Sequence, residues 1–343
     1  MKRFFEWLHD FIFVVRHALK DNSLKFRPGR ISRNAPVILP PKKDSFGWCL
    51  TKNAYIAGPS HMVRTEDSIV FYDLNYWFDR KRYLPEYWLA SVQIDECFGI
   101  IMMDTRIHYH NLKDILFQFF LMRKFNKNWK VIIFGRLSAV NLELLKAIEF
   151  RGTIFEMPRT LLAVHAKNFH SLDFTETNVL GKNSESIAPL FIEYSKVISN
   201  YFTQASTGLE ATQLKLFSSR RTSERRPKNN SEVEKVFESY GYKIVDFGLL
   251  SFQEQIQLTR NAKVIAGPHG ANLVNLIFAV PGTQIFEIMP SNFVVDCYEK
   301  LANIFNLPYH VMSGGDVIDK VFEVDIEKLK TSLQKIELKL KNS

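Results

Sequence analysis

The chain has 343 residues, 46% of them hydrophobic, which is enough to form the cores of two globular domains. Its three cysteines lie far apart and form no Cys-x-x-Cys pair, so neither a disulfide framework nor a structural zinc site is expected. The formal net charge of +9 suits a phosphorylated ligand or an anionic membrane surface, or is only a solvated basic surface; without a helix-turn-helix, zinc-finger or RNP pattern, nucleic acid is not an expected partner.

Residues 1–20 predict an amphipathic helix, because apolar residues recur at helical spacing among basic ones. The apolar run at residues 11–15 is too short for a signal peptide or a membrane span. Such a helix either anchors the chain on an anionic bilayer or packs on the protein's own core, and the sequence leaves both interpretations open.

The first half of the chain predicts alternating strands and helices. The expected elements are strands at 53–57, 68–72 and 97–103, a helix at 111–124, a strand at 130–134, a helix at 139–150 and a strand at 161–164. Strands separated by helices indicate βαβ units and a parallel sheet. The polar stretch at 172–184 predicts a linker, so residues 1–185 and 186–343 are expected to form two domains.

The second half repeats this alternation more regularly, after a helix at 187–202. The expected elements are strands at 213–218, 243–247, 263–266 and 284–288, and helices at 232–240, 252–262, 271–278 and 326–341. Gly241, which can adopt a positive φ, is expected to end the helix before it. The pattern again predicts a doubly wound α/β domain.

The strongest motif is AKVIAGPHGANLVNLIF at residues 262–278, in which a β-branched strand runs into Gly-Pro-His-Gly directly before a helix. Ligands of open parallel sheets bind beyond the carboxyl ends of the strands. Gly267 and Gly270 would let a ligand approach the backbone, and the N–H groups near Ala271 and Asn272 would favour an anion. The motif therefore predicts a diphosphate site, and its spacing matches neither GxGxxG nor Walker A.

Three side chains near this motif are candidate ligand contacts, each with a second interpretation. His269 either donates to a phosphate or caps the helix. Asn275 either contacts the ligand or is a buried amide that bonds a neighbouring strand. Glu287, at the end of the next strand, either accepts from ribose hydroxyls or is exposed to solvent.

A second motif, SSRRTSERRPKNN at residues 218–230, concentrates arginines in one loop after a strand. Guanidinium groups bind phosphate oxygens in a bidentate geometry, so Arg220 and Arg226 are candidate phosphate ligands beside the Gly-Pro-His-Gly loop. The competing interpretation is a solvated basic loop.

Residues 215–290 resemble the C-terminal domain of glycosyltransferase family 61, the group that includes capsular polysaccharide biosynthesis proteins. The shared features follow one another in order: Ser219-Arg220, then Arg226, Asn230 and Glu232, then LLSFQEQIQL, AKVIAGPHGANLVNLIF and PGTQIFEI. In the first half, His110 and Asp114 match the family's His followed four residues later by Asp. The family often has an aromatic residue and a proline around that helix, and this sequence reads HNLKDILFQF instead.

The resemblance implies an α/β protein of GT-B type, with two Rossmann-like domains facing each other across a cleft. It also implies inverting transfer from a nucleotide sugar, a UDP-sugar, without a metal ion or other cofactor. Inversion requires a general base. His110 and Asp114 would share one helix face and either could be that base, with Asp104 and His108 as reserve candidates.

The expected function is transfer of a sugar to a surface-polysaccharide or lipid-linked glycan acceptor, in the cytoplasm or on the inner face of the plasma membrane. The alternative is a non-catalytic protein of polysaccharide assembly, which binds a nucleotide sugar or phosphate through Arg220, Arg226 and the glycine motif but lacks a base. A nucleic-acid-binding protein would use the positive charge but would explain none of the ordered motifs.

Overall fold

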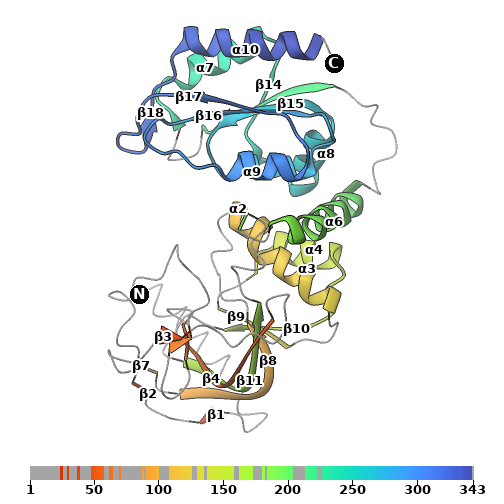
Figure 1. Cartoon of the computed structure of the whole chain (residues 1–343), viewed down its shortest axis with the longest axis vertical. Helices are drawn as coiled ribbons and strands as arrows, with labels where there is room; N and C mark the ends of the chain where they lie inside the picture. The colour runs from red at the N-terminus through yellow and green to blue at the C-terminus, as the bar shows by residue number, and fades with distance from the viewer. Residues whose placement is uncertain are drawn as a thin grey trace. The chain divides into compact units, whose positions relative to one another are not determined.

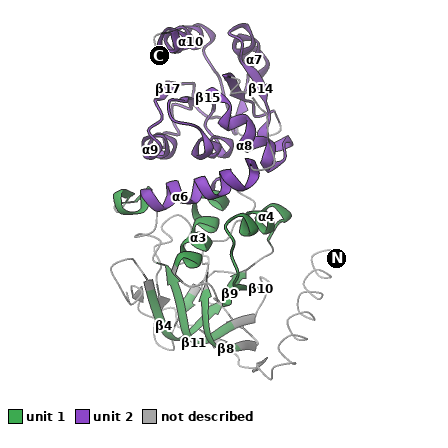
Figure 2. Ribbon diagram, turned by 90° about the vertical axis from the view of Figure 1, so that its right-hand side faces the viewer, with its two compact units in different colours: residues 1–106, 110–187 green, residues 107–109, 188–343 purple. Residues whose placement is uncertain are grey.

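The computed structural model of the chain describes residues 24–25, 29–30, 37–38, 48–57, 62–64, 69–70, 87–88, 90–99, 108–125, 130–134, 137–157, 162–172, 180–181, 184–203, 213–221 and 226–341. The chain forms two compact units, unit 1 with residues 1–106 and 110–187 and unit 2 with residues 107–109 and 188–343 (Figure 2). The helix expected at residues 1–20 and most of the linker expected at 172–184 lie outside the described residues.

Unit 1 contains a mixed β-sheet with the strand order β10-β9-β8-β11-β4-β5-β6-β3, and β1 pairs with β8 (Figure 1). The strands are β1 (Leu24–Lys25), β3 (Val37–Ile38), β4 (Trp48–Ala57), β5 (Met62–Arg64), β6 (Ile69–Val70), β8 (Ala90–Gly99), β9 (Lys130–Phe134), β10 (Thr153–Met157) and β11 (Leu162–Leu172). A separate pair joins β2 (Gly29–Arg30) to β7 (Tyr87–Trp88).

The pairing of this sheet is only partly as expected. Strands β8, β9, β10 and β11 run parallel to their neighbours in that set, which confirms the βαβ interpretation for them. Strand β4 instead runs antiparallel to both β11 and β5, so the expectation of a purely parallel sheet is wrong there. Only residues 58–61 join β4 to β5, and a connection of that length allows a hairpin but not the crossover that parallel neighbours need.

One helical segment of residues 108–125 changes its type along its length. It begins as α2 (His108–His110), continues as the π-helix η1 (Asn111–Ile115) and ends as α3 (Leu116–Phe125). This confirms the helix expected at 111–124. Residues 111–122 are all buried, however, so this is a core helix and not one with a single apolar face. A further helix of unit 1, α4 (Ala139–Ala147), begins at its N-cap Ser138.

Unit 2 is built on a parallel five-stranded sheet with the order β14-β12-β15-β16-β17. Its strands are β12 (Leu214–Ser218), β14 (Lys243–Val245), β15 (Ala262–Pro268), β16 (Gln284–Met289) and β17 (Tyr309–Ser313), with β13 (Arg226–Pro227) and β18 (Val321–Phe322) as a separate pair. Helices α7 (Asn230–Ser239) and α10 (Ile326–Lys341) cover one face, and α8 (Phe252–Arg260) and α9 (Cys297–Ile304) the other (Figure 1). The expected doubly wound α/β arrangement of this half is confirmed.

Three further helices complete the described chain: α6 (Ser184–Thr203) and the 3₁₀ helices η2 (Phe247–Leu249) and η3 (Ala271–Phe278). Gly241 has φ +78° and follows α7, which confirms its expected part in ending that helix. None of the helices in the described part of the chain combines the length and the apolar character needed to cross a lipid bilayer.

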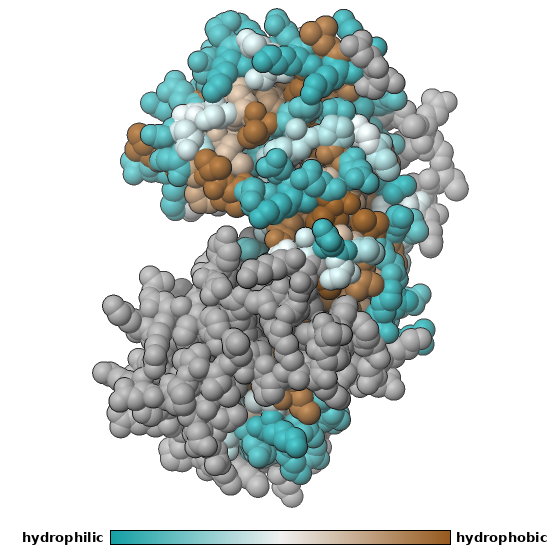
Figure 3. Space-filling view, in the orientation of Figure 1, coloured by the Kyte–Doolittle hydropathy of each residue, from teal (hydrophilic) through white to brown (hydrophobic). Residues whose placement is uncertain are grey.

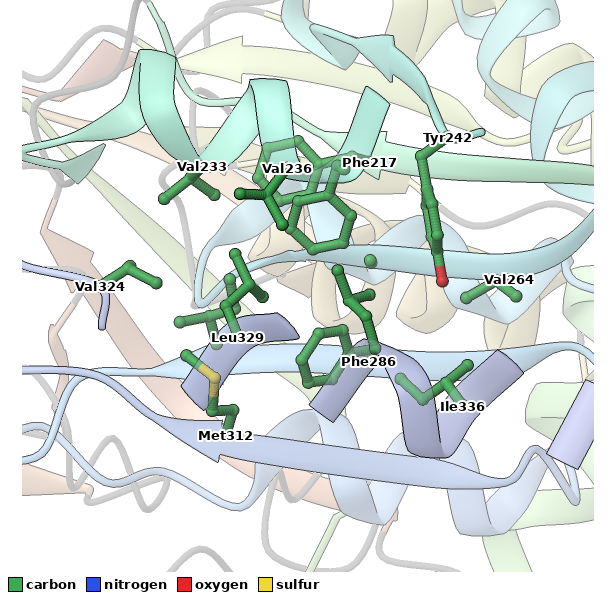
Figure 4. Packing of buried hydrophobic residues seen from close by; sticks show 14 of the residues in the cluster. Phe217, Val233, Val236, Tyr242, Val264, Phe286, Met312, Val324, Leu329 and Ile336 are labelled. Carbon is green, nitrogen blue, oxygen red and sulfur yellow. The ribbon is translucent and has the colours of Figure 1, made fainter. Parts of the chain in front are cut away.

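One hydrophobic core of unit 2 lies between the sheet and helices α7 and α10 (Figure 4). Phe217 of β12 stacks on Phe237 of α7 with the ring centroids 4.0 Å apart, and Phe286 of β16 packs beside them. Cutting back one buried phenylalanine of this kind to alanine costs roughly 3–5 kcal/mol of folding free energy. The core therefore holds β12, β15 and β16 in fixed positions, and the candidate site lies at the carboxyl ends of these strands.

The described surface of unit 2 is largely hydrophilic in the view of Figure 3, with small hydrophobic patches between polar residues. Individually exposed apolar side chains are ordinary on protein surfaces.

Candidate functional site

Strands β12, β15 and β16 end side by side in the sheet of unit 2. The structure corrects the expected extent of the Gly-Pro-His-Gly loop, because Gly267 and Pro268 belong to β15. Gly267 pairs with Glu287 and Pro268 with Ile288 of β16, and the His269 N–H donates to the Ile288 carbonyl at 2.9 Å. The continuing parallel ladder extends the strand, so only His269 and Gly270 remain between β15 and η3.

His269 is fixed through both its ring and its backbone. Its Nδ1 lies 2.5 Å from Oε1 of Glu287, and its ring contacts the rings of Phe293 and Tyr298 at centroid distances of 5.4 and 5.3 Å. Only 9% of the His269 residue is exposed. The structure thus brings two predicted residues, His269 and Glu287, into one hydrogen-bonded pair.

Glu287 is completely buried in β16, so the alternative of a solvent-exposed carboxylate is wrong. Its second oxygen, Oε2, accepts a hydrogen bond from the hydroxyl of Tyr309 in β17. Burial, and next the charge of Glu287, raise the pKa of the Tyr309 hydroxyl, which therefore keeps its proton and acts as the donor. Both carboxylate oxygens accept from protein groups in this structure.

Arg220 reaches the same place from the end of β12. Its Nη1 donates to the His269 carbonyl oxygen at 2.5 Å. A side chain at Gly270 would overlap the Arg220 guanidinium, so glycine permits the arginine to lie against the loop. Gly267 has a different role, because a Cβ there would lie 3.0 Å from the Cβ of Ser218 and the missing side chain lets β12 and β15 pack closely.

The other described arginines of the basic loop are held by different groups. Arg221 donates to both oxygens of Glu234, which also accepts from Ser219 at 2.5 Å and from Asn230 at 2.5 Å. Burial by itself would raise the pKa of Glu234, but the hydrogen bonds from Arg221, Ser219 and Asn230 outweigh it and lower the pKa. Glu234 therefore serves as an anchor for the turn that carries Arg220.

Arg226 lies in β13, where it pairs with Val321 of β18, and its side chain is exposed. Its Nη1 donates to the Arg221 carbonyl at 3.3 Å. Arg226 is therefore hydrogen-bonded within the arginine loop, whereas Arg220 is hydrogen-bonded to the backbone of His269. Residues 222–225 of this loop lie outside the described residues.

The helix after the motif is a 3₁₀ helix and not the expected α-helix. Its first internal hydrogen bond runs from the Leu273 N–H to the Gly270 carbonyl at 3.0 Å, so the N–H groups of Ala271 and Asn272 precede it. Ala271 and Asn272 are half-buried. The anion-binding role of these amides stays a prediction.

Asn275 is fully buried on η3, and both ends of its amide bond protein groups. Its Nδ2 donates to Gln255 at 3.0 Å, and its Oδ1 accepts from Nε2 of His108 at 3.3 Å. The structure therefore favours the buried-amide interpretation over a direct ligand contact. The motif letter alone could not separate the two, because the partners come from residues 20 and 167 positions away.

His110 and Asp114, the two candidates for the general base, lie in unit 1. Nδ1 of His110 is 2.7 Å from Oδ2 of Asp114, whose side chain is only 2% exposed, while 24% of the His110 side chain is exposed. The side chain of Lys113 contacts the other Asp114 oxygen. Since the Nδ1 proton is directed at the carboxylate, Nε2 carries the lone pair of the neutral ring and is the nitrogen that can accept a proton.

The His110–Asp114 pair coincides with η1. Single π-turns inside helices occur frequently at functional sites. Of the reserve candidates, His108 packs against Phe252 in unit 2 with ring centroids 6.1 Å apart. Burial lowers the pKa of His108. The hydrogen bond to Asn275 raises it, but by less, so the pKa lies below its ordinary value. Asp104 lies outside the described residues.

Two tyrosines of the site were not among the residues expected from the sequence. The hydroxyl of Tyr298 on α9 donates to the Gly270 carbonyl at 2.7 Å, and Tyr309 on β17 donates to Glu287. Neither α9 nor β17 was expected, and β17, with the sequence YHVMS, shows no continuous apolar run. Within the described residues, no group of three or more His, Cys, Asp or Glu side chains could hold a metal ion, and metal-independent transfer stays a prediction.

Comparison with known proteins agrees with the resemblance of residues 215–290 to glycosyltransferase family 61. The Glycosyltransferase 61 family model matches residues 4–286. A segment of 82 residues is 38% identical to a β-1,2-xylosyltransferase of Arabidopsis thaliana, covering 22% of this chain and 15% of that protein. A segment of 103 residues is 31% identical to an EGF domain-specific O-linked N-acetylglucosamine transferase of Drosophila melanogaster, covering 29% of this chain and 20% of that protein.

A similar segment of 89 residues is 33% identical to the Xenopus laevis protein of the same description, covering 25% of this chain and 16% of that protein. The chain thus aligns with no more than a fifth of the length of these three relatives. The family model, in contrast, extends through both units, from the first residues of unit 1 to β16 of unit 2. The chain therefore belongs to glycosyltransferase family 61.

Proposed function

We propose that this family 61 glycosyltransferase transfers a sugar, with inversion, from a UDP-sugar to a surface-polysaccharide or lipid-linked glycan acceptor. The observation that carries the proposal is the cluster of Arg220, His269 and the first amides of η3 at the carboxyl ends of β12 and β15. A parallel sheet binds its ligands at this edge. The names of the aligned relatives, a xylosyltransferase and N-acetylglucosamine transferases, support sugar transfer in general.

The cluster suits a leaving diphosphate. During transfer, the bond between the sugar C1 and the phosphate oxygen breaks, and the nucleoside diphosphate departs with the electron pair. The guanidinium of Arg220, the doubly protonated ring of His269 and the N–H groups of Ala271 and Asn272 can all donate hydrogen bonds to an anion. Donors fixed in advance stabilise such developing charge without reorganising.

The acceptor hydroxyl requires a base, and we assign this role to Nε2 of His110. As the new bond from the acceptor oxygen to C1 forms, Nε2 takes the hydroxyl proton and Asp114 balances the resulting positive charge. The family resemblance further supports a GT-B arrangement, in which unit 1 would serve the acceptor and unit 2 the donor. In the alternative, non-catalytic function, unit 2 would bind a nucleotide sugar and no transfer would follow.

The first experiment is a thermal-shift screen with UDP-, GDP- and CMP-sugars. A ligand that binds the folded chain raises its melting temperature once its concentration exceeds its Kd. Because charged hydrogen bonds contribute about 1.5–3 kcal/mol, Arg220→Ala should weaken binding of the best ligand roughly tenfold to a hundredfold. Arg151→Ala, at an exposed arginine of unit 1, is the matched control.

The ligand that gives the largest shift is then tested for hydrolysis and for transfer to glycan acceptors. Transfer or hydrolysis supports the enzyme, whereas binding without either supports the non-catalytic alternative. If Arg220→Ala and Arg151→Ala bind the ligand equally well, the donor site proposed here is wrong.

A further inference from the structure

The carboxylate of Glu287 is the most deeply buried charged group of the donor site. It lies in β16 between β15 and β17, with 0% of the residue exposed. Burial of a carboxylate is costly unless hydrogen bonds replace its water. Glu287 receives two such bonds, one from Nδ1 of His269 at 2.5 Å and one from the hydroxyl of Tyr309. The three side chains thus form one chain of hydrogen bonds across three neighbouring strands or their ends.

The direction of these hydrogen bonds determines the state of His269. Because burial and the charge of Glu287 raise the pKa of Tyr309, its hydroxyl stays protonated and donates to the carboxylate. The remaining carboxylate oxygen must then accept the Nδ1 proton of His269. The histidine is therefore held with Nδ1 directed into the protein and Nε2 directed away from Glu287.

Because Nδ1 is bonded to Glu287, Nε2 is the nitrogen of the His269 ring that can form a hydrogen bond with a ligand. The rings of Phe293 and Tyr298 contact the imidazole and restrict its rotation. The backbone is also held, since the N–H donates to Ile288 and the carbonyl accepts from Arg220. Among the described residues, none donates a hydrogen bond to Nε2 or accepts one from it.

We propose that Tyr309 and Glu287 are positioning residues of the donor site, which act on the diphosphate through His269. Glu287 holds the Nδ1 proton and the orientation of the ring, and Tyr309 fixes Glu287, so that the Nε2–H of the doubly protonated ring faces the leaving phosphate beside Arg220. This inference rests on the proposed function. It also gives Glu287 an indirect role in place of a ribose contact.

The test uses Glu287→Gln and Tyr309→Phe in the full chain, each alone and combined with His269→Ala. Carboxylate partners of metal-binding histidines contribute roughly tenfold to a hundredfold, and by analogy we expect Glu287→Gln to lower kcat/KM for UDP-sugar hydrolysis by about that factor. Tyr309→Phe should lower it roughly twofold to tenfold, the worth of one hydrogen bond. In the His269→Ala background, both substitutions should have almost no further effect.

Matched controls use exposed residues of unit 2. Glu327→Gln on α10 and Tyr201→Phe on α6 make the same chemical changes away from the site and should leave kcat/KM unchanged. A ligand-independent readout is the ¹⁵N NMR spectrum of histidine-labelled protein at about pH 8.5, where an ordinary histidine is neutral. The His269 signals, identified by their loss in His269→Ala, should show a protonated Nδ1 in the wild type and a mixture of tautomers in Glu287→Gln.

The outcomes separate this inference from the proposed function. If His269→Ala lowers kcat/KM but Glu287→Gln and Tyr309→Phe lower it further by their full single-variant factors, the positioning role is wrong and the donor site stands. If His269→Ala leaves UDP binding and turnover unchanged, the proposed donor site itself fails. Should Glu287→Gln not fold, Tyr309→Phe and the tautomer of wild-type His269 still decide, because an unprotonated Nδ1 would overturn the inference.

Discussion

Each unit of this protein contains a histidine whose Nδ1 is bonded to a buried carboxylate. In unit 1, His110 lies 2.7 Å from Asp114, and in unit 2, His269 lies 2.5 Å from Glu287. The first pair is local, four residues apart in one helical segment, while the second joins the end of one strand to its neighbour. Both pairs direct Nε2 away from the carboxylate.

The two pairs differ in the second partner of the carboxylate. Asp114 also contacts the ammonium group of Lys113, whereas Glu287 also accepts from the neutral hydroxyl of Tyr309. The charge of Asp114 is therefore shared with a cation, and that of Glu287 is directed mainly at His269. The first arrangement suits a neutral ring that accepts a proton, and the second suits a ring that donates to an anion. The surroundings of a carboxylate can therefore assign opposite tasks to the same two groups.

The largest effect should come from breaking the pair in unit 1. His110→Ala and Asp114→Asn should lower kcat roughly a hundredfold to ten-thousandfold, the usual contribution of general acid–base catalysis, and leave UDP binding unchanged. Steady-state kinetics and calorimetric titration with UDP would measure the two quantities. Asp319→Asn, an isosteric change at an exposed residue with φ +48°, is the control. A loss of UDP affinity equal to the loss of kcat would contradict the division of tasks.

An intermediate effect should follow from removing the second partner of each carboxylate. Lys113→Met should destabilise the fold by about 3 kcal/mol, because a buried charge loses its ionic partner. Tyr309→Phe should cost only about 1 kcal/mol, the net worth of an ordinary hydrogen bond. Urea unfolding compares them, with Lys146→Met on the exposed side of α4 as the control. Equal costs for Lys113→Met and Tyr309→Phe would remove the contrast drawn between the two pairs.

The smallest effect concerns His108, which belongs to neither pair. Burial lowers its pKa from the ordinary 6.5, so below about pH 6.5 the unfolded chain binds a proton that the folded chain does not. Stability should then fall on acidification by at most about 1.4 kcal/mol per pH unit from this group. His108→Gln should reduce the loss of melting temperature between about pH 7.5 and pH 5.5. If the variant and the wild type lose stability equally, His108 is not held neutral.

Local patterns in the sequence predicted unit 2 well. Its buried strands are short β-branched or aromatic runs, and Gly241 ends the helix that precedes it. Such signals lie within a few residues of the element that they define. The place of His269 at the carboxyl end of a parallel strand followed from the same reasoning.

Features that depend on distant partners were not predictable in this way. Strand β4 pairs antiparallel with β11, about a hundred residues further along the chain, and no local signal sets that direction. The roles of Asn275 and Glu287 likewise depend on His108, Gln255 and Tyr309, which lie on other elements. The sequence indicated that Asn275 and Glu287 are polar groups near the site, but their hydrogen-bond partners became known only from the structure.

The π-turn at Asn111–Ile115 has a consequence for how the chain tolerates change. A π-turn holds one more residue than the α-helical turn that it replaces, and each residue of an α-helix rotates the chain by about 100°. The extra residue is taken up within the turn, so deleting one residue between His110 and Asp114 would restore a regular helix and leave the direction of α3 nearly unchanged. Both side chains of the pair would remain present, but they would lie three positions apart instead of four, so the length of this segment, as well as its composition, determines how Nδ1 meets the carboxylate.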